Sequence, residues 1–191
     1  PYGYHFVCGD DNKLIWLMSV DRETPLRLFS GHQDAITNVK YHENSVTIAS
    51  ASHDGSVMLW DVRASNGKSS CTRVFADGDN AIPLSIAFSR NGRVIVTGDE
   101  NGKITTWDIG ESRKYGSVSG RKGQIRDMAI SQEGTILATA GAGGEVSLWD
   151  MSTLSSNTAS NAKPLKKFTP KHSFTNRLSF SSRNLLHAIG S

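Results

Sequence analysis

The stretch SHDGSVMLWD at residues 52–61 returns in altered form as DENGKITTWD at 99–108 and as GAGGEVSLWD at 141–150. Each copy begins with a glycine-containing turn, continues as a short run of alternating residues, and ends in Trp-Asp. The three Trp-Asp endings lie 47 and 42 residues apart. A period of about 40–45 residues with this ending is typical of the four-stranded repeat that builds β-propellers.

Short apolar runs around each Trp-Asp ending predict four strands per repeat and an all-β fold. A hairpin turn centred on Asp54-Gly55 is expected in the first full repeat, because Asp-Gly accepts the positive φ angles that a two-residue turn needs. The predicted strands are 36–41, 46–50, one ending at Trp60 and 71–75 in the first full repeat, then 83–88, 93–97, one ending at Trp107 and 115–119 in the second, and 125–130, 135–139, one ending at Trp149 and 164–168 in the third.

Partial repeats flank the three full ones. Upstream, 4–8, 14–18 and 25–29 are predicted as a second, third and fourth strand, and downstream 174–180 and 185–189 as a first and second strand. The total is seventeen strands. Propellers close as rings of complete blades. We therefore expect residues 1–191 to be one incomplete propeller domain that belongs to a larger, seven-bladed ring.

Two alignments compete for the upstream third strand. Aligning Trp16 with Trp60 places Lys13 where the full repeats have a valine or isoleucine. Aligning Met18 with Trp60 places Ile15 there and also matches the fourth strands. We choose the second alignment, which puts Trp16 on the alternate face of its strand.

Composition is that of a soluble β protein without a prosthetic group. Apolar residues make up 37% of the chain, which contains 18 glycines. No run approaches the roughly 18 apolar residues of a membrane span, and no signal peptide opens the chain. The two cysteines, Cys8 and Cys71, fall on different predicted strands and lack metal-ligand spacing, so we expect reduced thiols and no metal or cofactor.

The charges are unevenly distributed along the chain. All 18 acidic residues lie at or before Asp150, whereas the last 41 residues carry six basic residues and no acidic one. Two accounts remain open: a solvated blade edge on which lysines discourage strand pairing, or a contact patch for an acidic protein surface that includes Lys166, Lys167 and Lys171. Direct binding of nucleic acid is not expected, because no aromatic residues alternate with these lysines.

Residues 151–163 (MSTLSSNTASNAK) interrupt the last full repeat. This segment is rich in Ser, Asn, Thr and Ala and lacks apolar periodicity. We therefore expect a mobile loop between the third and fourth strands.

The repeats resemble those of the WD-repeat (WD40) family. The resemblance implies a buried hydrogen-bonded set in each blade: the His of a Gly-His pair, a Ser or Thr of the second strand, the turn Asp and the third-strand Trp. These residues are structural and not catalytic. The set is complete once, as His32, Ser50, Asp54 and Trp60. The matching positions elsewhere are Asp79, Thr97, Asn101 and Trp107, then Arg121, Thr139, Gly143 and Trp149, and, in the first partial repeat, Cys8, Asn12 and Met18.

A narrower resemblance rests on PYGYHFV at 1–7, TPLRLFSGH at 24–32 and FSSRNLLHAIG at 180–190. These segments are similar to the last blades of the WD-repeat TBP-associated factors of the general transcription factor TFIID, related or shared forms of which serve the SAGA-type coactivator. The resemblance implies a nuclear, non-enzymatic scaffold that docks histone-fold TBP-associated factors in transcription initiation by RNA polymerase II. Two lost Gly-His pairs and WLMSVD at 16–21 depart from the family pattern.

The sequence also contains short motifs typical of two other binding roles and of an enzyme. The sequence WDVR at 60–63 matches the Trp-Asp-x-Arg box of propellers that recruit substrates to cullin-type ubiquitin ligases, although Arg63 can equally lie on an exposed loop. A nuclear reader of histone tails or peptides would use the propeller mouth. Catalysis is not expected, since GAGG at 141–144 lacks the Lys-Ser/Thr of a phosphate loop. The residues expected at the mouth are His53, Glu100, Gln124 and Arg126, beside Ala142. They form no acidic or aromatic cage for a peptide.

Overall fold

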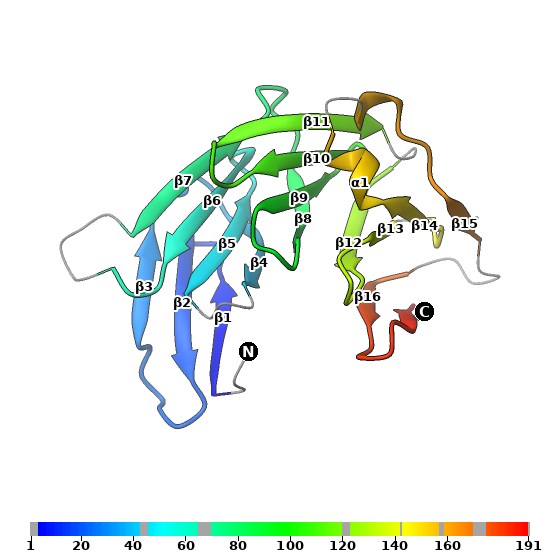
Figure 1. Ribbon diagram of the computed structural model, residues 1–191. Coiled ribbons are helices and arrows are strands. Elements are labelled where there is room, and N and C mark those ends of the chain that lie inside the picture. The colour runs from blue at the N-terminus through cyan, green and yellow to red at the C-terminus, as the bar shows by residue number, and fades with distance from the viewer. Residues whose placement is uncertain are drawn as a thin grey trace. The chain divides into compact units, whose positions relative to one another are not determined.

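The computed structural model describes residues 4–42, 46–64, 70–119, 123–141, 143–156, 159–169 and 175–190. The chain divides into two compact units, Pro1–Pro83 and Leu84–Ser191. Within the described residues there are seventeen β-strands, one short α-helix and one 3-10 turn (Figure 1). Neighbouring strands pair antiparallel, which confirms the all-β prediction.

The first unit contains a three-stranded and a four-stranded sheet, with strands in sequence order across each. The three-stranded sheet is β1 (His5–Gly9), β2 (Leu14–Ser19) and β3 (Arg27–Ser30). The four-stranded sheet is β4 (Ile36–Tyr41), β5 (Thr47–Ser52), β6 (Ser56–Asp61) and β7 (Cys71–Ala76).

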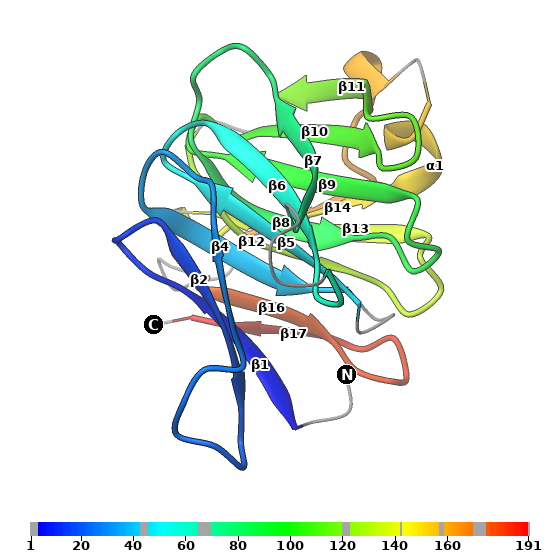
Figure 2. The same cartoon turned by 90° about the vertical axis from the view of Figure 1, so that its left-hand side faces the viewer.

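The second unit contains two four-stranded sheets and a two-stranded one. The first comprises β8 (Pro83–Phe88, whose first residue closes the first unit), β9 (Val94–Asp99), β10 (Lys103–Asp108) and β11 (Arg113–Ser119). The second comprises β12 (Ile125–Ile130), β13 (Ile136–Gly141), β14 (Val146–Asp150) and β15 (Lys166–Phe168). Strands β16 (Arg177–Phe180) and β17 (Leu186–Ile189) run side by side in Figure 2. Every predicted strand is present, with ends shifted by up to three residues.

Pairing across β2 settles its alignment with the later repeats. Ile15 pairs with Phe29 on β3. In the next sheet Val57 pairs with a phenylalanine at the same place. Ile15 therefore occupies the position of Val57, and the position of Trp60 falls on Met18. The second of the two alignments is confirmed.

Trp16 lies on the alternate face of β2. Ile15 and Leu17 are buried on one face, whereas Trp16 is half-buried. The Trp16 indole Nε1 donates a hydrogen bond of 2.9 Å to Oδ2 of Asp10, in the turn before the strand. Trp16 therefore braces a hairpin turn and takes no part in the buried core.

The hairpin turns differ by one residue from the prediction. The N–H of Gly55 donates to the carbonyl of Ser52 at 3.1 Å, so the central residues are His53 and Asp54 instead of Asp54 and Gly55. Only the glycine has a positive φ, at 79°. Gly102 and Gly144 repeat the pattern, with φ of 82° and 73°. Glycine thus stands where the chain leaves the turn in the left-handed region, which costs other residues more.

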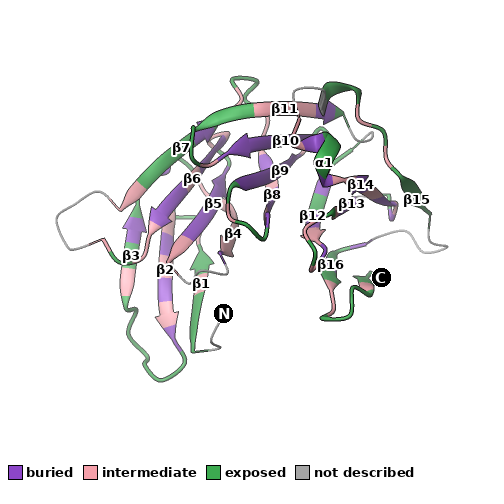
Figure 3. Cartoon of the chain, viewed as in Figure 1, coloured by how far each residue is buried: buried purple, intermediate pink, exposed green. Residues whose placement is uncertain are grey.

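The cores lie between sheets that are neighbours in sequence. In the first unit, Ile15, Leu17 and Phe29 pack with Ile48 and Trp60. The larger core of the second unit contains residues of β8 to β14 and of the short helix. In Figure 3 the central strands β9 and β10 are almost wholly buried, whereas the edge strand β15 is exposed.

Small residues on the second strand of a repeat allow the next repeat to approach. A Cβ atom added to Gly98 on β9 would lie 2.6 Å from Cγ2 of Ile125, the first residue of β12. The same relation holds in the first unit, where a Cβ on Gly9 would lie 2.3 Å from Cγ2 of Ile36. Since real Cβ contacts are not this short, glycine sets the spacing between adjacent sheets at both places.

The segment 151–163 differs at its start from the loop that we expected. Helix α1 (Met151–Leu154) follows β14 directly, with Asp150 as its N-cap, and η1 (Ala159–Asn161) follows later. Met151 and Leu154 are buried in the core of the second unit. A single turn with two apolar residues is too short to show periodicity, so its order depends on tertiary packing. Mobility elsewhere in the segment stays a prediction. Neither helix of the described chain is long and apolar enough to cross a membrane.

Replacing Gly98 with alanine tests the spacing between sheets. We expect Gly98→Ala to lower the free energy of unfolding by about 1–3 kcal/mol, because Ile125 and the Ser85 hydroxyl must both move to admit the new methyl group. Urea unfolding of the variant and the wild type measures the change. In the double variant Gly98→Ala/Ile125→Ala the combined loss should be smaller than the sum of the two single losses. Additive losses would contradict the contact.

Candidate functional site

The complete set of four polar residues forms one buried hydrogen-bonded chain in the first unit. The Trp60 indole Nε1 donates to Ser50 Oγ at 2.8 Å. Ser50 Oγ lies 2.7 Å from His32 Nε2, and His32 Nδ1 lies 2.9 Å from Asp54 Oδ2. His32, Ser50 and Trp60 are buried, and the Asp54 side chain is 11% exposed.

The two end residues, Trp60 and Asp54, determine which atom donates in each hydrogen bond of this chain. The indole can only donate, and the carboxylate can only accept. Ser50 therefore accepts from Trp60 and gives its own proton to His32 Nε2, while His32 Nδ1 carries the proton that is donated to Asp54. Every polar atom along the chain has a partner. The histidine is thus fixed in one tautomer by contacts with residues of its own blade, and both His32 and Ser50 are buried.

Two further residues, missed by the sequence analysis, supply three hydrogen-bond donors to the Asp54 carboxylate. Ser56 donates from its hydroxyl at 2.6 Å and from its backbone N–H at 2.9 Å to Oδ1, and the Gln33 N–H donates to Oδ2 at 2.8 Å. Burial by itself would raise the pKa of Asp54, but the bonds from Ser56, Gln33 and His32 lower it to about 2. The sequence feature that could have predicted the Ser56 donors is a serine two residues after the turn aspartate.

The full repeats of the second unit keep one bond of this chain. Trp107 Nε1 donates to Thr97 Oγ1 at 3.2 Å, and Trp149 Nε1 donates to Thr139 Oγ1 at 3.1 Å. Without a histidine, each threonine hydroxyl turns to a carbonyl of the adjacent third strand, at 3.4 and 3.5 Å. Each buried hydroxyl therefore still accepts one hydrogen bond and donates another.

The other positions of the eroded sets take different roles. Asp79 is exposed in the first unit, and Gly143 is exposed in the second. At the β9–β10 turn, Asp99 Oδ1 accepts from the N–H groups of Asn101 and Lys103 at 2.9 and 2.8 Å. Burial raises the pKa of Asp99. Arg121 lies outside the described residues.

The residues expected at the propeller mouth are mixed in charge and exposure. His53 is exposed in the first unit. In the second unit, Gln124 and Arg126 are exposed and Glu100 is half-buried. Arg126 Nη1 donates to Asn176 Oδ1 at 3.5 Å. Ala142 lies outside the described residues.

The predicted basic patch lies on the edge strand β15. Lys167 Nζ forms an ion pair of 3.3 Å with Glu145 Oε1, and Lys166 Nζ lies 5.0 Å from the centre of the Phe168 ring. Both lysines are exposed. Lys171 lies outside the described residues, so its place in the patch stays a prediction.

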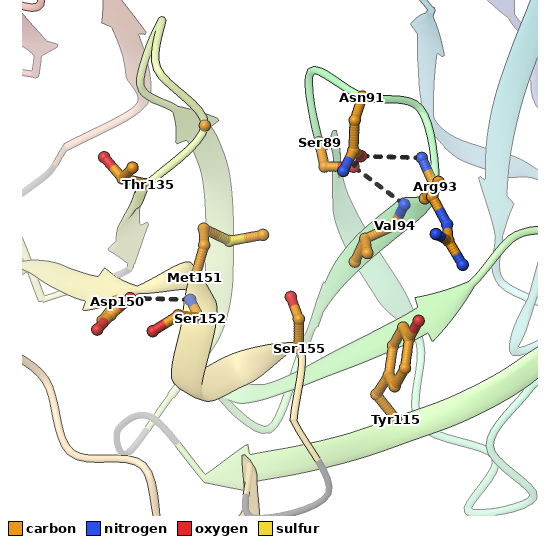
Figure 4. A pocket seen from close by; sticks show the side chains of 11 residues that line it. Ser89, Asn91, Arg93, Val94, Tyr115, Thr135, Asp150, Met151, Ser152 and Ser155 are labelled. Atoms are coloured by element: carbon orange, nitrogen blue, oxygen red, sulfur yellow. Dashed lines mark hydrogen bonds between the residues drawn. The ribbon is translucent and has the colours of Figure 1, made fainter.

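A pocket of about 410 Å³ lies in the second unit, where the sequence analysis expected nothing (Figure 4). The β8–β9 and β12–β13 loops, strand β11 and the start of the inserted segment all contribute to it. Among the described residues, no group of three His, Cys, Asp or Glu side chains is placed to hold a metal ion. The polar and aromatic side chains of its lining include Ser89, Asn91, Arg93, Tyr115, Asp150, Ser152 and Ser155.

A family model described as WD domain, G-beta repeat matches residues 23–61, 69–108 and 112–150. The matched segments cover more than half of the chain, and each ends at one of the three Trp-Asp pairs. The chain belongs to the WD domain, G-beta repeat family. Together with the antiparallel four-stranded sheets, this membership identifies the fold as part of a WD40 propeller.

Relatives with quite different names share the repeats. Transcription initiation factor TFIID subunit 5 of Caenorhabditis elegans is 32% identical over 127 residues, which are 64% of this chain and 19% of that protein. Target of rapamycin complex subunit wat1 of Schizosaccharomyces pombe is 25% identical over 107 residues, 56% of this chain and 32% of that protein. Telomerase Cajal body protein 1 of Mesocricetus auratus is 28% identical over 126 residues, 59% and 22% of the two chains. The chain thus spans about a fifth to a third of these relatives.

The lowered pKa of Asp54 predicts a pH-dependent contribution to stability. Its charged form is favoured in the folded state, so the contribution is complete above the ordinary pKa of 3.8 and is lost as the pH falls through about 2. We expect the stability difference between the wild type and Asp54→Asn to shrink by about 2 kcal/mol between pH 6 and pH 2. Urea unfolding across this range measures it. A difference that does not change with pH would contradict the prediction.

The completeness of the His32 set predicts that its repeat is the most rigid. Trp60→Ala should cost about 3–5 kcal/mol of unfolding free energy, because Trp60 is 1% exposed and packs against the rings of Phe29 and His32. Trp107 is 7% exposed and belongs to an incomplete set, so Trp107→Ala should cost less. Denaturant unfolding of both variants compares them. A larger loss at Trp107 would disprove the ranking.

Proposed function

We propose that this chain is a non-enzymatic scaffold that binds other proteins. The observation that carries the proposal is the chain from Trp60 to Asp54, in which the His32 imidazole and the Ser50 hydroxyl are buried and hydrogen-bonded within the blade. Groups with reactive potential are therefore used to hold a blade together. Repeat folds of this kind offer their outer surfaces for contacts with partners.

The proposed setting is a TFIID-like complex in the nucleus, with SAGA-like coactivators as a second setting of the same type. The supporting observations are the 32% identity to a TFIID subunit 5 and the PYGYHFV and FSSRNLLHAIG segments. The likeness to a Cajal body protein also favours the nucleus. In this setting the partners are histone-fold TBP-associated factors. The other relatives have different names, so family membership alone does not select this setting. The TFIID-like setting is therefore a more specific proposal than family membership.

A second candidate is a substrate receptor of a cullin-type ubiquitin ligase. The observation that favours it is the presentation of Arg63, whose side chain is 74% exposed. Its N–H is fixed by Asp61 Oδ1 at 2.7 Å, directly after the Trp-Asp pair. Arg63 of the WDVR box is therefore exposed to solvent on an ordered turn. A histone-tail reader has less support, because His53, Glu100 and Arg126 offer no uniform cage.

Purification of the tagged full-length protein from its native cells tests these assignments. We expect mass spectrometry to find histone-fold TBP-associated factors together with TBP or an acetyltransferase module. The variant Arg63→Ala should keep these companions, as should Arg22→Ala, an exposed arginine in the same unit. A cullin and its adaptor, lost in Arg63→Ala but retained in Arg22→Ala, would overturn the TFIID assignment in favour of the ligase. An absence of any stable protein companion would contradict the scaffold.

A further inference from the structure

The inserted segment, residues 151–163, forms one wall of the pocket in the second unit. Ser152 and Ser155 belong to the segment, whereas Arg93 and Tyr115 come from the preceding repeat. In Figure 4, Asp150 and Ser152 lie on one side of the hollow, Arg93 and Tyr115 lie on the other, and Ser155 lies between them. In the preceding full repeat, residues 109–112 form a short turn between the Trp-Asp pair and β11, so this wall distinguishes the third full repeat from the second.

The wall is held firmly in place. Asp150 Oδ1 accepts from the Ser152 N–H at 2.8 Å and caps α1. The Thr106 hydroxyl on β10 donates to the carbonyl of Leu154 at 2.6 Å, and Leu154 itself is buried. Ser155, the next residue, is therefore positioned by contacts with both repeats. A preformed site of this kind loses little entropy when a ligand binds.

Hydrogen-bond donors remain available on the pocket lining. The guanidinium of Arg93 makes no hydrogen bond or ion pair within the described part of the chain. The hydroxyls of Ser152 and Ser155 likewise have no hydrogen-bond partner there. Asn91, by contrast, is occupied, since its Oδ1 accepts from the Ser89 hydroxyl at 2.6 Å and from the Arg93 N–H at 3.0 Å.

Two acidic side chains at or beside the pocket, Asp150 and Asp108, accept hydrogen bonds from neighbouring residues. Asp108 accepts from the Tyr115 hydroxyl and, at 2.8 Å, from the Glu111 N–H. The hydrogen bond from Tyr115 and the nearby charge of Arg93 contribute to a lowered pKa of Asp108, which stays ionised. Asp150 lines the pocket, and its Oδ1 accepts the Ser152 N–H as the N-cap of α1. The charge of Asp108 thus acts on Arg93, whose guanidinium N–H groups make no hydrogen bond with any described residue and can bind a ligand.

We propose that this pocket binds an anionic side chain, a phosphorylated residue or a carboxylate, from a partner polypeptide. The inference rests on the proposed scaffold function, to which it adds a contact point. Arg93 would pair with the anion through two parallel N–H groups, the arrangement that guanidinium favours for phosphate and carboxylate. Ser152 and Ser155 would donate to its remaining oxygens, and Tyr115 and Met151 would contact the aliphatic stem.

Calorimetric titration of the purified protein tests the pocket without any partner protein. The probes are O-phospho-L-serine and N-acetyl-L-glutamate, at fixed pH and at an ionic strength fixed with KCl. We expect saturable binding that weakens about tenfold or more in Arg93→Gln and a few-fold in Ser155→Ala. The control Arg183→Gln removes an exposed arginine from the corresponding β16–β17 loop and should bind as the wild type does. Thermal unfolding verifies that each variant is folded.

Each outcome has a defined meaning. Binding of phosphoserine alone identifies the occupant as a phosphorylated residue, whereas binding of both probes identifies any acidic side chain. An absence of saturable binding, or equal binding by Arg93→Gln, overturns the proposal. Because the titration contains no partner, its failure leaves the scaffold function untouched. If the pocket binds the probes but the full-length protein purifies without companions, the scaffold function fails and the anion site remains.

Discussion

The hydrogen bond between an indole N–H and a hydroxyl on the preceding strand recurs in every full repeat. It joins residues ten apart: Trp60 to Ser50, Trp107 to Thr97, and Trp149 to Thr139. All of these groups are buried. A buried donor or acceptor that loses its partner costs more than the bond itself contributes. The bond therefore fixes the register of the second and third strands and, through the tryptophan ring, the packing of the core.

The first partial repeat shows how this constraint can be relaxed. Cys8 and Met18 stand in the positions of the hydroxyl and the indole, again ten residues apart. Donor and acceptor are replaced together, so no strong polar group is left without a partner. In the full repeats of the second unit both the histidine and the turn aspartate are replaced, and the threonine hydroxyls donate to strand carbonyls instead. In both of these repeats the buried threonine hydroxyl and the tryptophan indole remain hydrogen-bonded.

Most of the fold could be predicted because alternation and spacing are local signals, as the alignment of Ile15 with Val57 shows. The details that failed depend on geometry that one sequence does not contain. Asp54-Gly55 suits two turn types, and only the bond from Gly55 to Ser52 distinguishes them. Ser56 lies outside the expected set of four residues. The pocket could not be foreseen, because α1 gains its order from burial of Met151 and Leu154 against another repeat.

Ile125 packs closely against Gly98, 27 positions earlier in the chain, because glycine has no side chain. A repeat protein unfolds as one unit only when the interfaces between repeats are strong relative to the repeats themselves. At this interface the fit depends on how small one residue is. Cooperativity between adjacent repeats can therefore be tuned at this glycine without altering the hydrogen-bonded set of either repeat, so each blade's internal stability and its coupling to the next are under separate control.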